Sequence, residues 1–353
     1  MNNRKSPRRI LLIRNDRVGD LVLTLPAIEL LRQHFPQAHL AALVSPYAGP
    51  LLAGHPAIDE LLYDEPAQSA WQLSRRLRTQ RFDTALVINT NTRNCLAVRL
   101  ARIRRRVCWG YKPIGWLSST HPVKLHRNRP PIHEAAFALA FVRLLGAPVP
   151  AEMPLPRLPI DSAARERVVE RIARELGTDG PLFGVHPGNK NSAYNWPASH
   201  YAQLVGRLAE HGRVMITGGP DERALLETVG HNVSAAHRHR VGIYSDLSLV
   251  ELTAALGQQS TLVVSSTGPM HLAAAVGTPV VALFSPHPAH VPAKWAPLGQ
   301  HHTLLVAPLE PGEDPSVPRE RGTDLMTRIG VDEVLAAALS HAHQKPSNRT
   351  RAA

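Results

Sequence analysis

Short apolar runs alternate with amphipathic segments along the first half of the chain. Residues 9–14 (RILLIR) form an apolar run, and a polar loop separates it from a helical pattern of apolar positions. The same succession begins again at residues 38–45 (AHLAALVS) and at residues 84–89 (TALVIN). Strands that alternate with helices in this way are typical of βαβ units, so the pattern predicts a parallel sheet.

A proline-rich stretch separates this region from a second series of strands and helices. Residues 147–159 (APVPAEMPLPRLP) contain five prolines and no periodic pattern, which predicts an extended linker. The alternation then resumes and predicts a second doubly wound sheet. Its predicted strands are residues 182–186, 213–217, 241–244, 261–266 and 279–284, and its predicted helices are residues 161–176, 198–211, 221–235, 248–257 and 268–276.

The length of the chain fits this division. A chain of 353 residues is too long for one typical core and suits two domains of about 150 residues each. We predict an α/β protein with two Rossmann-like, doubly wound parallel-sheet domains at residues 1–150 and 161–325, joined by a linker at 151–160. Residues 326–353 are expected to form a closing helix (VDEVLAAALSHAH) and a flexible tail.

The composition indicates a folded protein with an anionic partner. Hydrophobic residues make up 44% of the chain and aromatic residues 5%, which suits buried parallel strands better than an aromatic-rich β-sandwich. The net charge of +12 favours binding to a nucleic acid, a phosphorylated lipid or a nucleotide. The alternative is an arginine-rich composition without functional meaning.

The sequence does not predict a secreted or membrane-spanning protein. The first apolar residues (LLI) end at Arg14, too early for a secretory signal, and no stretch approaches the roughly 20 apolar residues of a membrane span. Cys95 and Cys108 are too few for a disulfide framework. We expect a cytoplasmic protein whose contact with the inner membrane is peripheral, at its cytoplasmic face.

The loop after the first strand (RNDRVGDLVLTLP) carries a candidate catalytic carboxylate. Ligands of open α/β sheets bind at the carboxyl ends of the strands. Asp20 lies where the next helix is expected to begin, and a carboxylate there can accept a proton from a substrate hydroxyl. The alternative is that Asp20 only caps the helix. Arg14 and Arg17 flank it and either bind an anionic acceptor or belong to a solvated loop.

Three turns after strands of the second half suit a nucleotide. Ser266, Thr267 and Gly268 stand at the start of a helix, where free backbone N–H groups and the helix dipole attract anions. The turn HPGNKNSAYNWP includes Lys190, and the turn ITGGPDE ends in Glu222, a carboxylate able to hold a ribose. Each turn alone is an ordinary loop, but together they favour a nucleotide site.

Motifs that the sequence lacks count against several other functions. It contains no G-x-G-x-x-G fingerprint, no G-x-x-x-x-G-K-[ST] phosphate loop and no H-E-x-x-H zinc pair, which disfavours a dehydrogenase and a P-loop kinase. The 19 histidines are scattered without metal-ligand spacing, so neither a metal nor a cofactor is expected. A nucleic-acid-binding module is disfavoured because aromatic residues for base stacking are sparse.

The sequence resembles glycosyltransferase family 9, the ADP-heptose:lipopolysaccharide heptosyltransferases. The likeness covers nearly the whole chain and follows the order of the family's motifs. These are RNDRVGDLVLTLPAIELLRQHFP, HEAAFALAFVRLLG, HPGNKNSAYNWPASHYAQL, ITGGPDE, DLSLVELTAALGQ and STGPMHLAAAVGTPVVALFSP. The resemblance implies a GT-B fold, in which two Rossmann-like domains face a central cleft, with the acceptor site in the first domain and the nucleotide in the second.

The resemblance also implies roles for individual residues. Asp20 matches the family's catalytic carboxylate, and Glu222 matches an acidic residue that contacts the nucleoside. The family's diphosphate-binding turn corresponds to Thr267, Gly268, Met270 and His271. Many members have Asp at the position of Ser266 and Lys or Arg at that of Tyr194, so the charge that steadies the leaving diphosphate is assigned here to Lys190.

The implied function is an inverting, metal-independent transfer of heptose from ADP-heptose to the lipopolysaccharide inner core, with Asp20 as the base. The basic residues expected to hold a phosphorylated, Kdo-bearing lipid are Arg14, Arg17, Arg102, Arg104, Arg105 and Arg106. The alternatives are a transferase for another nucleotide sugar or acceptor, a sugar-nucleotide epimerase, a nucleic-acid-binding protein and an inert nucleotide-binding protein.

Overall fold

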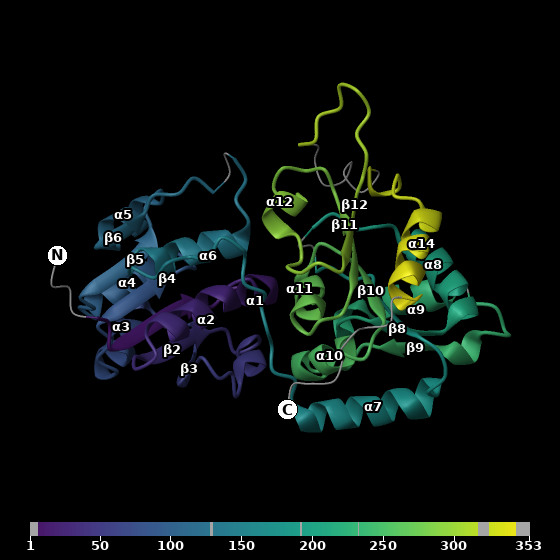
Figure 1. Ribbon diagram of the computed structural model, residues 1–353, viewed down its shortest axis with the longest axis horizontal. Helices are drawn as coiled ribbons and strands as arrows, with labels where there is room; N and C mark the ends of the chain where they lie inside the picture. Colours follow the sequence, from purple (N-terminus) through teal and green to yellow (C-terminus); the bar gives the residue numbers. More distant parts are fainter. Residues whose placement is uncertain (1–5, 128–129, 191–192, 232, 317–324, 344–353) are drawn as a thin grey trace. The chain divides into compact units, whose positions relative to one another are not determined.

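A computed structural model describes residues 6–127, 130–190, 193–231, 233–316 and 325–343 (Figure 1). The chain divides into two compact units, Met1–Pro159 and Ile160–Ala353. The boundary lies at the end of the proline-rich stretch 147–159, which contains no helix or strand. We refer to the two parts as the first and the second unit.

The first unit is built on a sheet of six parallel strands in the order β3-β2-β1-β4-β5-β6. The central strand β1 (Arg9–Arg14) pairs with β2 (His39–Val44) and with β4 (Thr84–Val87). The remaining strands are β3 (Glu60–Tyr63), β5 (Arg105–Trp109) and β6 (His121–Val123). Residues 10–13 are fully buried, as expected for a central parallel strand that is covered on both faces, and this explains their continuous apolar run.

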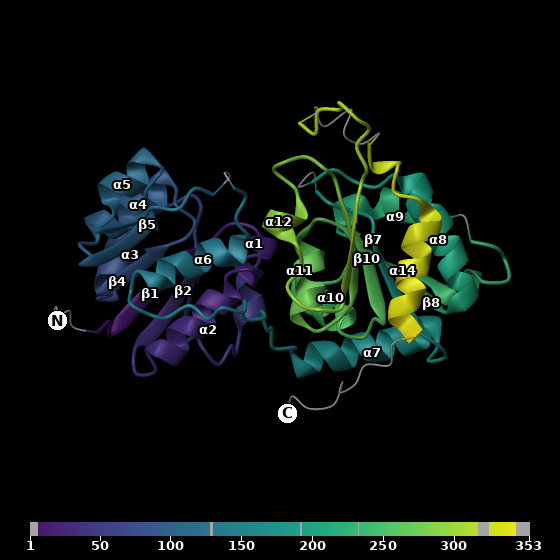
Figure 2. The same cartoon turned by 45° about the horizontal axis from the view of Figure 1, so that its top comes forward.

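Helices cover both faces of this sheet. On one face, α3 (Ala70–Thr79) and α4 (Thr92–Leu100) pack together, and their apolar side chains join a core cluster with strands β1 and β4. On the other face, α2 (Leu25–His34) lies beside α6 (Glu134–Arg143) (Figure 2). The shorter elements are α1 (Val18–Val22), the 3₁₀ turn η1 (Gly49–Leu52) and α5 (Pro113–Ser118).

The second unit repeats this architecture with the strand order β12-β11-β10-β7-β8-β9, all parallel. Its strands are β7 (Leu182–His186), β8 (Arg213–Thr217), β9 (Val241–Tyr244), β10 (Thr261–Ser265), β11 (Val280–Phe284) and β12 (His302–Val306). Its helical elements are α7 (Ser162–Leu176), α8 (Ala198–His211), η2 (Pro220–Glu222), α9 (Arg223–Gly230), η3 (Arg238–Arg240), α10 (Leu249–Leu256), α11 (Gly268–Ala275), α12 (Pro292–Trp295) and α14 (Val331–His343).

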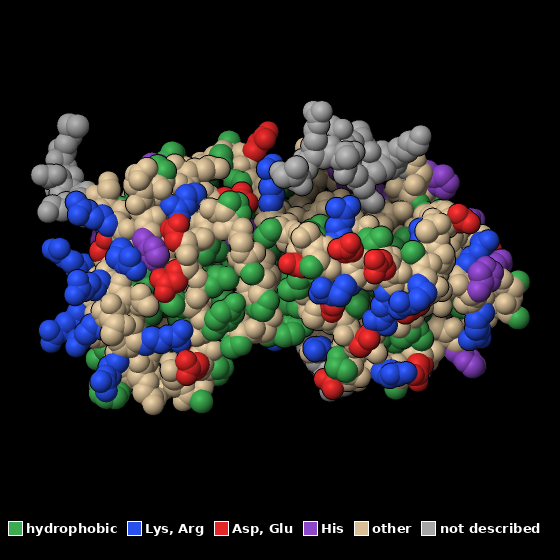
Figure 3. Space-filling view, turned by 90° about the horizontal axis from the view of Figure 1, so that it is seen from below, with side chains coloured by type: hydrophobic (Ala, Val, Ile, Leu, Met, Phe, Trp, Pro, Cys, Tyr) green, Lys and Arg blue, Asp and Glu red, His purple; other side chains and the backbone are tan. Residues whose placement is uncertain are grey.

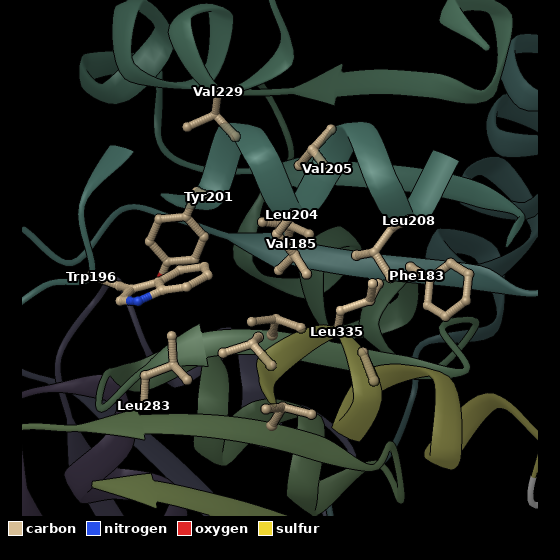
Figure 4. Close-up of a cluster of buried hydrophobic side chains, with 14 of the residues drawn as sticks. Phe183, Val185, Trp196, Tyr201, Leu204, Val205, Leu208, Val229, Leu283 and Leu335 are labelled. Atoms are coloured by element: carbon tan, nitrogen blue, oxygen red, sulfur yellow. The ribbon is translucent and has the colours of Figure 1, made fainter. Parts of the chain in front are cut away.

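Two apolar clusters hold the layers of the second unit together. On one face of the sheet, Leu208 of α8 and Leu335 of α14 meet Phe183 of β7 (Figure 4). A second cluster joins α7 and α10 to the sheet through side chains such as Ile172 and Met215. With helices on both faces of each sheet, the predicted pair of doubly wound, Rossmann-like sheets is confirmed.

Several boundaries differ from the sequence prediction. The sequence patterns do not predict β3, β5, β6 and β12, which are short strands with polar or basic residues. The helix predicted at 221–235 is shorter, because Pro220–Glu222 forms a 3₁₀ turn and α9 ends at Gly230. The closing helix is present as α14, and residues 344–353 of the predicted tail lie outside the described residues. In the part of the chain that the structure describes, no helix combines the length and apolarity needed to cross a bilayer.

Candidate active site

The first strand ends in an arginine that three carboxylates surround. Arg14 is the last residue of β1, and only 2% of its side chain is exposed. Its Nη2 atom donates to Asp20 and, over 2.8 Å, to Oε1 of Glu134, while its Nε atom lies 3.1 Å from Oδ1 of Asp16. A buried guanidinium needs such partners to offset its lost hydration. The structure therefore brings two of the predicted site residues, Arg14 and Asp20, into direct contact.

Glu134 joins this cluster from the start of α6. It is 1% exposed, and its second carboxylate oxygen accepts a hydrogen bond from Arg127. The cluster therefore contains two guanidinium groups and three carboxylates, which leaves an excess of one negative charge. The sequence analysis missed Glu134 as a site residue because it lies 120 positions from Arg14. The only signal was its place in the motif HEAAF.

The surroundings of Asp20 change its ionisation. Burial raises the pKa of Asp20 to about 6, because a desolvated carboxylate is less stable than its protonated form. The charge of Arg14 lowers this pKa, whereas the charges of Asp16 and Glu134 raise it. At neutral pH the carboxylate is ionised but holds a proton more tightly than an exposed aspartate does. This combination suits a general base.

The interpretation of Asp20 as a helix cap is wrong. Helix α1 begins at Val18 with Arg17 at its N-cap, and no side chain accepts a capping hydrogen bond there. Asp20 instead lies inside the first turn of α1, and its carboxylate contacts Arg14. The side chain of Arg17 is exposed to solvent.

At the carboxyl ends of β1, β3 and β4, asparagine side chains form hydrogen bonds with one another and with an ion pair. The Nδ2 atom of Asn15 donates to Oδ2 of Asp64 over 2.7 Å, and Oδ1 of Asn15 accepts from Asn89 at 2.9 Å and from Asn94 at 3.0 Å. Arg93 pairs with Asp64 at 2.9 Å. The sequence analysis did not select these residues, although Asn15 and Asp64 directly follow strands. They fix the loop that carries Asp16 and Arg17.

In the second unit, the turns after β7 and β8 meet at Glu222. Its Oε2 atom accepts from the N–H of Gly219 at 2.9 Å, and its Oε1 atom lies 3.4 Å from the backbone nitrogen of Lys190. A Cβ atom at position 188 would overlap the carboxyl group of Glu222, so Gly188 permits this close approach. The structure thus brings Lys190 and Glu222 together at neighbouring strand ends.

His186 ends β7 directly before this turn. It is buried, and its Nδ1 atom lies 2.9 Å from Oγ1 of Thr217. Burial lowers the pKa of His186 to about 4; the charge of Glu222 opposes this shift, and that of Lys190 adds to it. The imidazole is therefore neutral at neutral pH and acts as a hydrogen-bonding partner inside the unit.

The predicted diphosphate turn stands at the start of α11. Thr267 is the N-cap residue, yet its side chain makes no capping bond, and its buried Oγ1 atom has no hydrogen-bond partner among the described residues. Ser266 and Gly268 are half-buried, whereas the side chains of Met270 and His271 are buried. Backbone N–H groups at a helix start, beside an unpartnered hydroxyl, form a suitable site for an anion. Met270 is 0% exposed and offers a ligand no side-chain surface.

Two histidines that the sequence analysis did not select lie against Tyr194. Its ring centre is 5.5 Å from that of His287 and 5.6 Å from that of His290. Both histidines follow β11 directly, in the stretch SPHPAH, and this position after a strand was the available signal. Nearby, Oγ of Ser265 donates to Oδ1 of Asn195 over 2.8 Å and so ties the loop after β7 to the end of β10. In the described ranges, no three His, Cys, Asp or Glu side chains are placed to hold a metal ion.

Comparisons with known proteins identify the family and the fold. The model of glycosyltransferase family 9 (heptosyltransferase) matches residues 70–320. A Haemophilus influenzae protein provisionally described as a glycosyltransferase is 28% identical over 302 residues, which cover 82% of this chain and 86% of that protein. Lipopolysaccharide heptosyltransferase 2 of Escherichia coli is 25% identical over 294 residues, 79% of this chain and 83% of that protein. The solved structure of Escherichia coli ADP-heptose lipopolysaccharide heptosyltransferase II has a TM-score of 0.78 at 20% identity, with 95% of this chain and 98% of that one covered.

Proposed function

This chain belongs to glycosyltransferase family 9, the heptosyltransferase family, and we propose that it transfers a heptose from ADP-heptose to the inner core of lipopolysaccharide. Membership of the family makes it a glycosyltransferase, and its relatives include enzymes of lipopolysaccharide synthesis. The nucleotide, the sugar and the acceptor are our proposal. The name of the solved relative, an ADP-heptose lipopolysaccharide heptosyltransferase, supports this choice of donor.

The observation that carries the proposal is the carboxylate of Asp20, which is only 14% exposed and whose pKa is raised by burial to about 6. In the proposed reaction, Asp20 takes the proton of an acceptor hydroxyl while the hydroxyl oxygen bonds to the anomeric carbon of the donor. The bond between that carbon and the phosphate oxygen breaks, and ADP leaves with the electron pair. Attack opposite the leaving group inverts the anomeric configuration. A displacement of this kind requires no metal ion.

The donor is assigned to the turns of the second unit. Glu222 would accept hydrogen bonds from the ribose, because its carboxylate lies among the backbone groups of two turns. The start of α11 would bind the diphosphate through the hydroxyl of Thr267 and the backbone N–H of Gly268. The N–H groups of Ser266 and Met270 already donate to the carbonyl oxygens of Leu283 and Thr267, so these two residues would shape the turn. His271 would support this turn from inside the unit, and Lys190 would offset the charge that develops on the leaving ADP.

The acceptor is assigned to the first unit. The exposed Arg17 would contact an acidic or phosphorylated group of the saccharide. Arg14 is buried and already paired, so we propose that it acts on the acceptor by holding Asp20 in place. The lipid part of such an acceptor lies in a membrane, so we propose a peripheral enzyme at the cytoplasmic face of the inner membrane.

A ligand screen tests the donor assignment. Thermal unfolding is measured with ADP, UDP, GDP and CDP, because a ligand that binds only the folded state raises the unfolding temperature. We expect the largest shift with ADP, and a reduced shift for Glu222→Ala. The matched control is Asp221→Ala, which removes an exposed carboxylate from the same turn. A larger shift with UDP than with ADP would contradict the ADP-heptose assignment and favour another nucleotide sugar.

A further inference from the structure

The positive charge of the chain is concentrated in one segment of the first unit. Residues 70–124 contain 12 Lys and Arg residues and one acidic residue, Asp83, whereas the rest of the chain contains 28 basic and 27 acidic residues. The Oδ2 atom of Asp83 accepts from the backbone N–H groups of Arg8 and Arg9, at 2.8 and 3.0 Å. An arginine-rich composition of the whole chain does not produce such a distribution. The charge therefore marks the part of the molecule that carries α3, α4 and α5.

The same segment exposes large apolar side chains. Trp116 and Leu117 of α5 are 64% and 55% exposed, and Leu100 at the end of α4 is 45% exposed. Figure 3 shows Lys and Arg side chains gathered at the end of the first unit, where Figure 1 places α3, α4 and α5. We define the α3–α5 surface by its exposed residues, which are Trp71, Arg75, Arg78, Arg99, Leu100, Arg102, Arg104, Trp116 and Leu117.

Hydrogen bonds join the helices of this surface. Helix α3 packs on α4, and α4 packs on α5. The side chain of Arg78 donates to the carbonyl oxygen of Leu100 over 3.1 Å, and that of Arg99 donates to the carbonyl oxygen of Leu117 over 2.8 Å. Each of these guanidinium groups thus lies beside an exposed apolar residue of the next helix. The α3–α5 surface is therefore continuous, with mixed basic and apolar character.

The charge of this surface is not neutralised by neighbouring acids. Its arginines form no ion pair with any carboxylate in the described ranges, in contrast to Arg76 and Arg93, which pair with Glu65 and Asp64. The guanidinium of Arg75 lies 4.9 Å from the ring centre of Trp71, and this contact leaves its charge intact. The positive charge thus stays available to a partner.

We propose that the α3–α5 surface docks this protein on a bilayer rich in anionic lipids. Tryptophan and leucine side chains enter the headgroup region, and arginines extend to the lipid phosphates, so this combination fits a bilayer surface. Leu100 and Leu117 favour a lipid partner over a nucleic acid, because aliphatic side chains do not stack on bases as aromatic rings do. This inference rests on the membrane contact in the proposed function and assigns that contact to one surface. It is argued from the charge and exposure of the surface residues and does not depend on the identity of the donor.

Vesicle binding tests the proposal with the full-length chain. Co-sedimentation is measured with vesicles of phosphatidylcholine alone and with vesicles that also contain phosphatidylglycerol, at low and at high salt. The test variant combines Arg75→Gln, Arg102→Gln and Arg104→Gln, because these side chains form no hydrogen bond or ion pair with a described residue. The control variant replaces by Gln three exposed arginines that lie outside the α3–α5 surface and form no ion pair in the described ranges, namely Arg143, Arg165 and Arg238.

We expect binding only to the anionic vesicles, a steep loss at high salt, and on the order of 100-fold weaker binding for the test variant. The control variant should bind like the unchanged protein. A second variant, Trp116→Ser with Leu117→Ser, should weaken the binding that remains at moderate salt. Equal vesicle binding of the test variant and the unchanged protein would overturn the proposal.

Two further measurements distinguish the lipid-docking surface from a nucleic-acid-binding surface and from the donor assignment. A fluorescent single-stranded oligonucleotide that bound the unchanged protein more tightly than the anionic vesicles did would assign the surface to nucleic acid and overturn the lipid proposal. The thermal shift by ADP is measured on the same samples and should be equal in the test variant and the unchanged protein. A failure of the donor assignment appears in that shift alone, whereas a failure of the docking surface appears in the vesicle assay alone.

Discussion

Arg14 donates to Glu134 over 2.8 Å and so joins the end of the first strand to the start of α6, 120 positions later. The same guanidinium contacts Asp20, and both carboxylates therefore act on one buried cation. Because the cluster contains one more carboxylate than guanidinium groups, a proton on Asp20 makes it neutral. Burial is the main cause of the raised pKa of Asp20, and this excess of negative charge adds to it, while the contact with Arg14 fixes the orientation of the carboxylate.

Glu134→Gln should make Asp20 a weaker base. Burial, opposed by Arg14, raises the pKa of Asp20, and the negative charges of Asp16 and Glu134 raise it further. Without the charge of Glu134, the acid limb of the kcat/KM profile should move to lower pH by about one unit. The control is Glu29→Gln, a half-buried carboxylate of the same unit outside the cluster. If the acid limb of the kcat/KM profile lay at the same pH in both variants, the charge of Glu134 would have no effect on the pKa of Asp20.

Asp20→Asn should stabilise the fold at neutral pH. Burial raises the folded-state pKa of Asp20 from 3.8 to about 6, so the folded protein binds the proton more tightly than the unfolded chain. The stability that this proton contributes is present below pH 3.8 and is lost as pH rises through 6. Above that pH the ionised group costs at most about 3 kcal/mol.

Urea unfolding of Asp20→Asn and the unchanged protein at pH 4 and pH 7 checks this prediction. The free energy of unfolding of the variant, relative to that of the unchanged protein, should be higher at pH 7 than at pH 4. The same relative stability at the two pH values would show that Asp20 titrates alike in the folded and unfolded states.

Gly188→Ala should weaken the binding of ADP. A Cβ atom at this position overlaps the carboxyl group of Glu222, which must then move and release the N–H of Gly219. We expect ADP to bind on the order of tenfold more weakly, as measured by calorimetry. Gly330→Ala is the control, because a Cβ atom there meets open space and the residue lies outside the turns assigned to the donor. Equal losses in both variants would argue against a specific role of Glu222.

Thr267→Val separates a ligand-binding hydroxyl from a structural one. The Oγ1 atom is buried without a partner among the described residues, and such a group costs folding free energy. The valine variant should therefore unfold at the same or a higher temperature, while its affinity for ADP should fall by several-fold. A lower unfolding temperature with unchanged ADP affinity would show that the hydroxyl serves the fold instead.

The sequence predicts elements whose signal is local. Central strands such as β1 and β7 are buried on both faces, so their apolar runs stand out, and both have the predicted bounds. β6 (HPV) and β12 (HTLLV) are edge strands with partly exposed residues, and their sequences resemble loops. What distinguishes them is pairing with the preceding strand, β5 for β6 and β11 for β12, and no local pattern contains this pairing.

In the candidate sites too, the sequence predicts residues with a local signal and misses those that join the site through tertiary contacts. Asp20, Lys190 and Glu222 were predicted because each lies in the segment that follows a strand, among recognisable residues. Glu134 joins the first site only because α6 packs beside α2, with the start of α6 at Arg14. Asp20 also illustrates that position alone does not decide between a cap and a base, since that choice depends on the direction of its carboxylate toward Arg14.

The turnover of Asp20→Asn tests the central claim most directly. Asn keeps the shape of the side chain but cannot take the proton of the acceptor hydroxyl, so kcat should fall by about 10²–10⁴-fold. Donor affinity should barely change, because ADP is assigned to the second unit. The measurement is heptose transfer from ADP-heptose to an inner-core acceptor, with ADP binding determined on the same preparation. Near-normal turnover by a folded variant with intact ADP binding would contradict the role of Asp20 as the base.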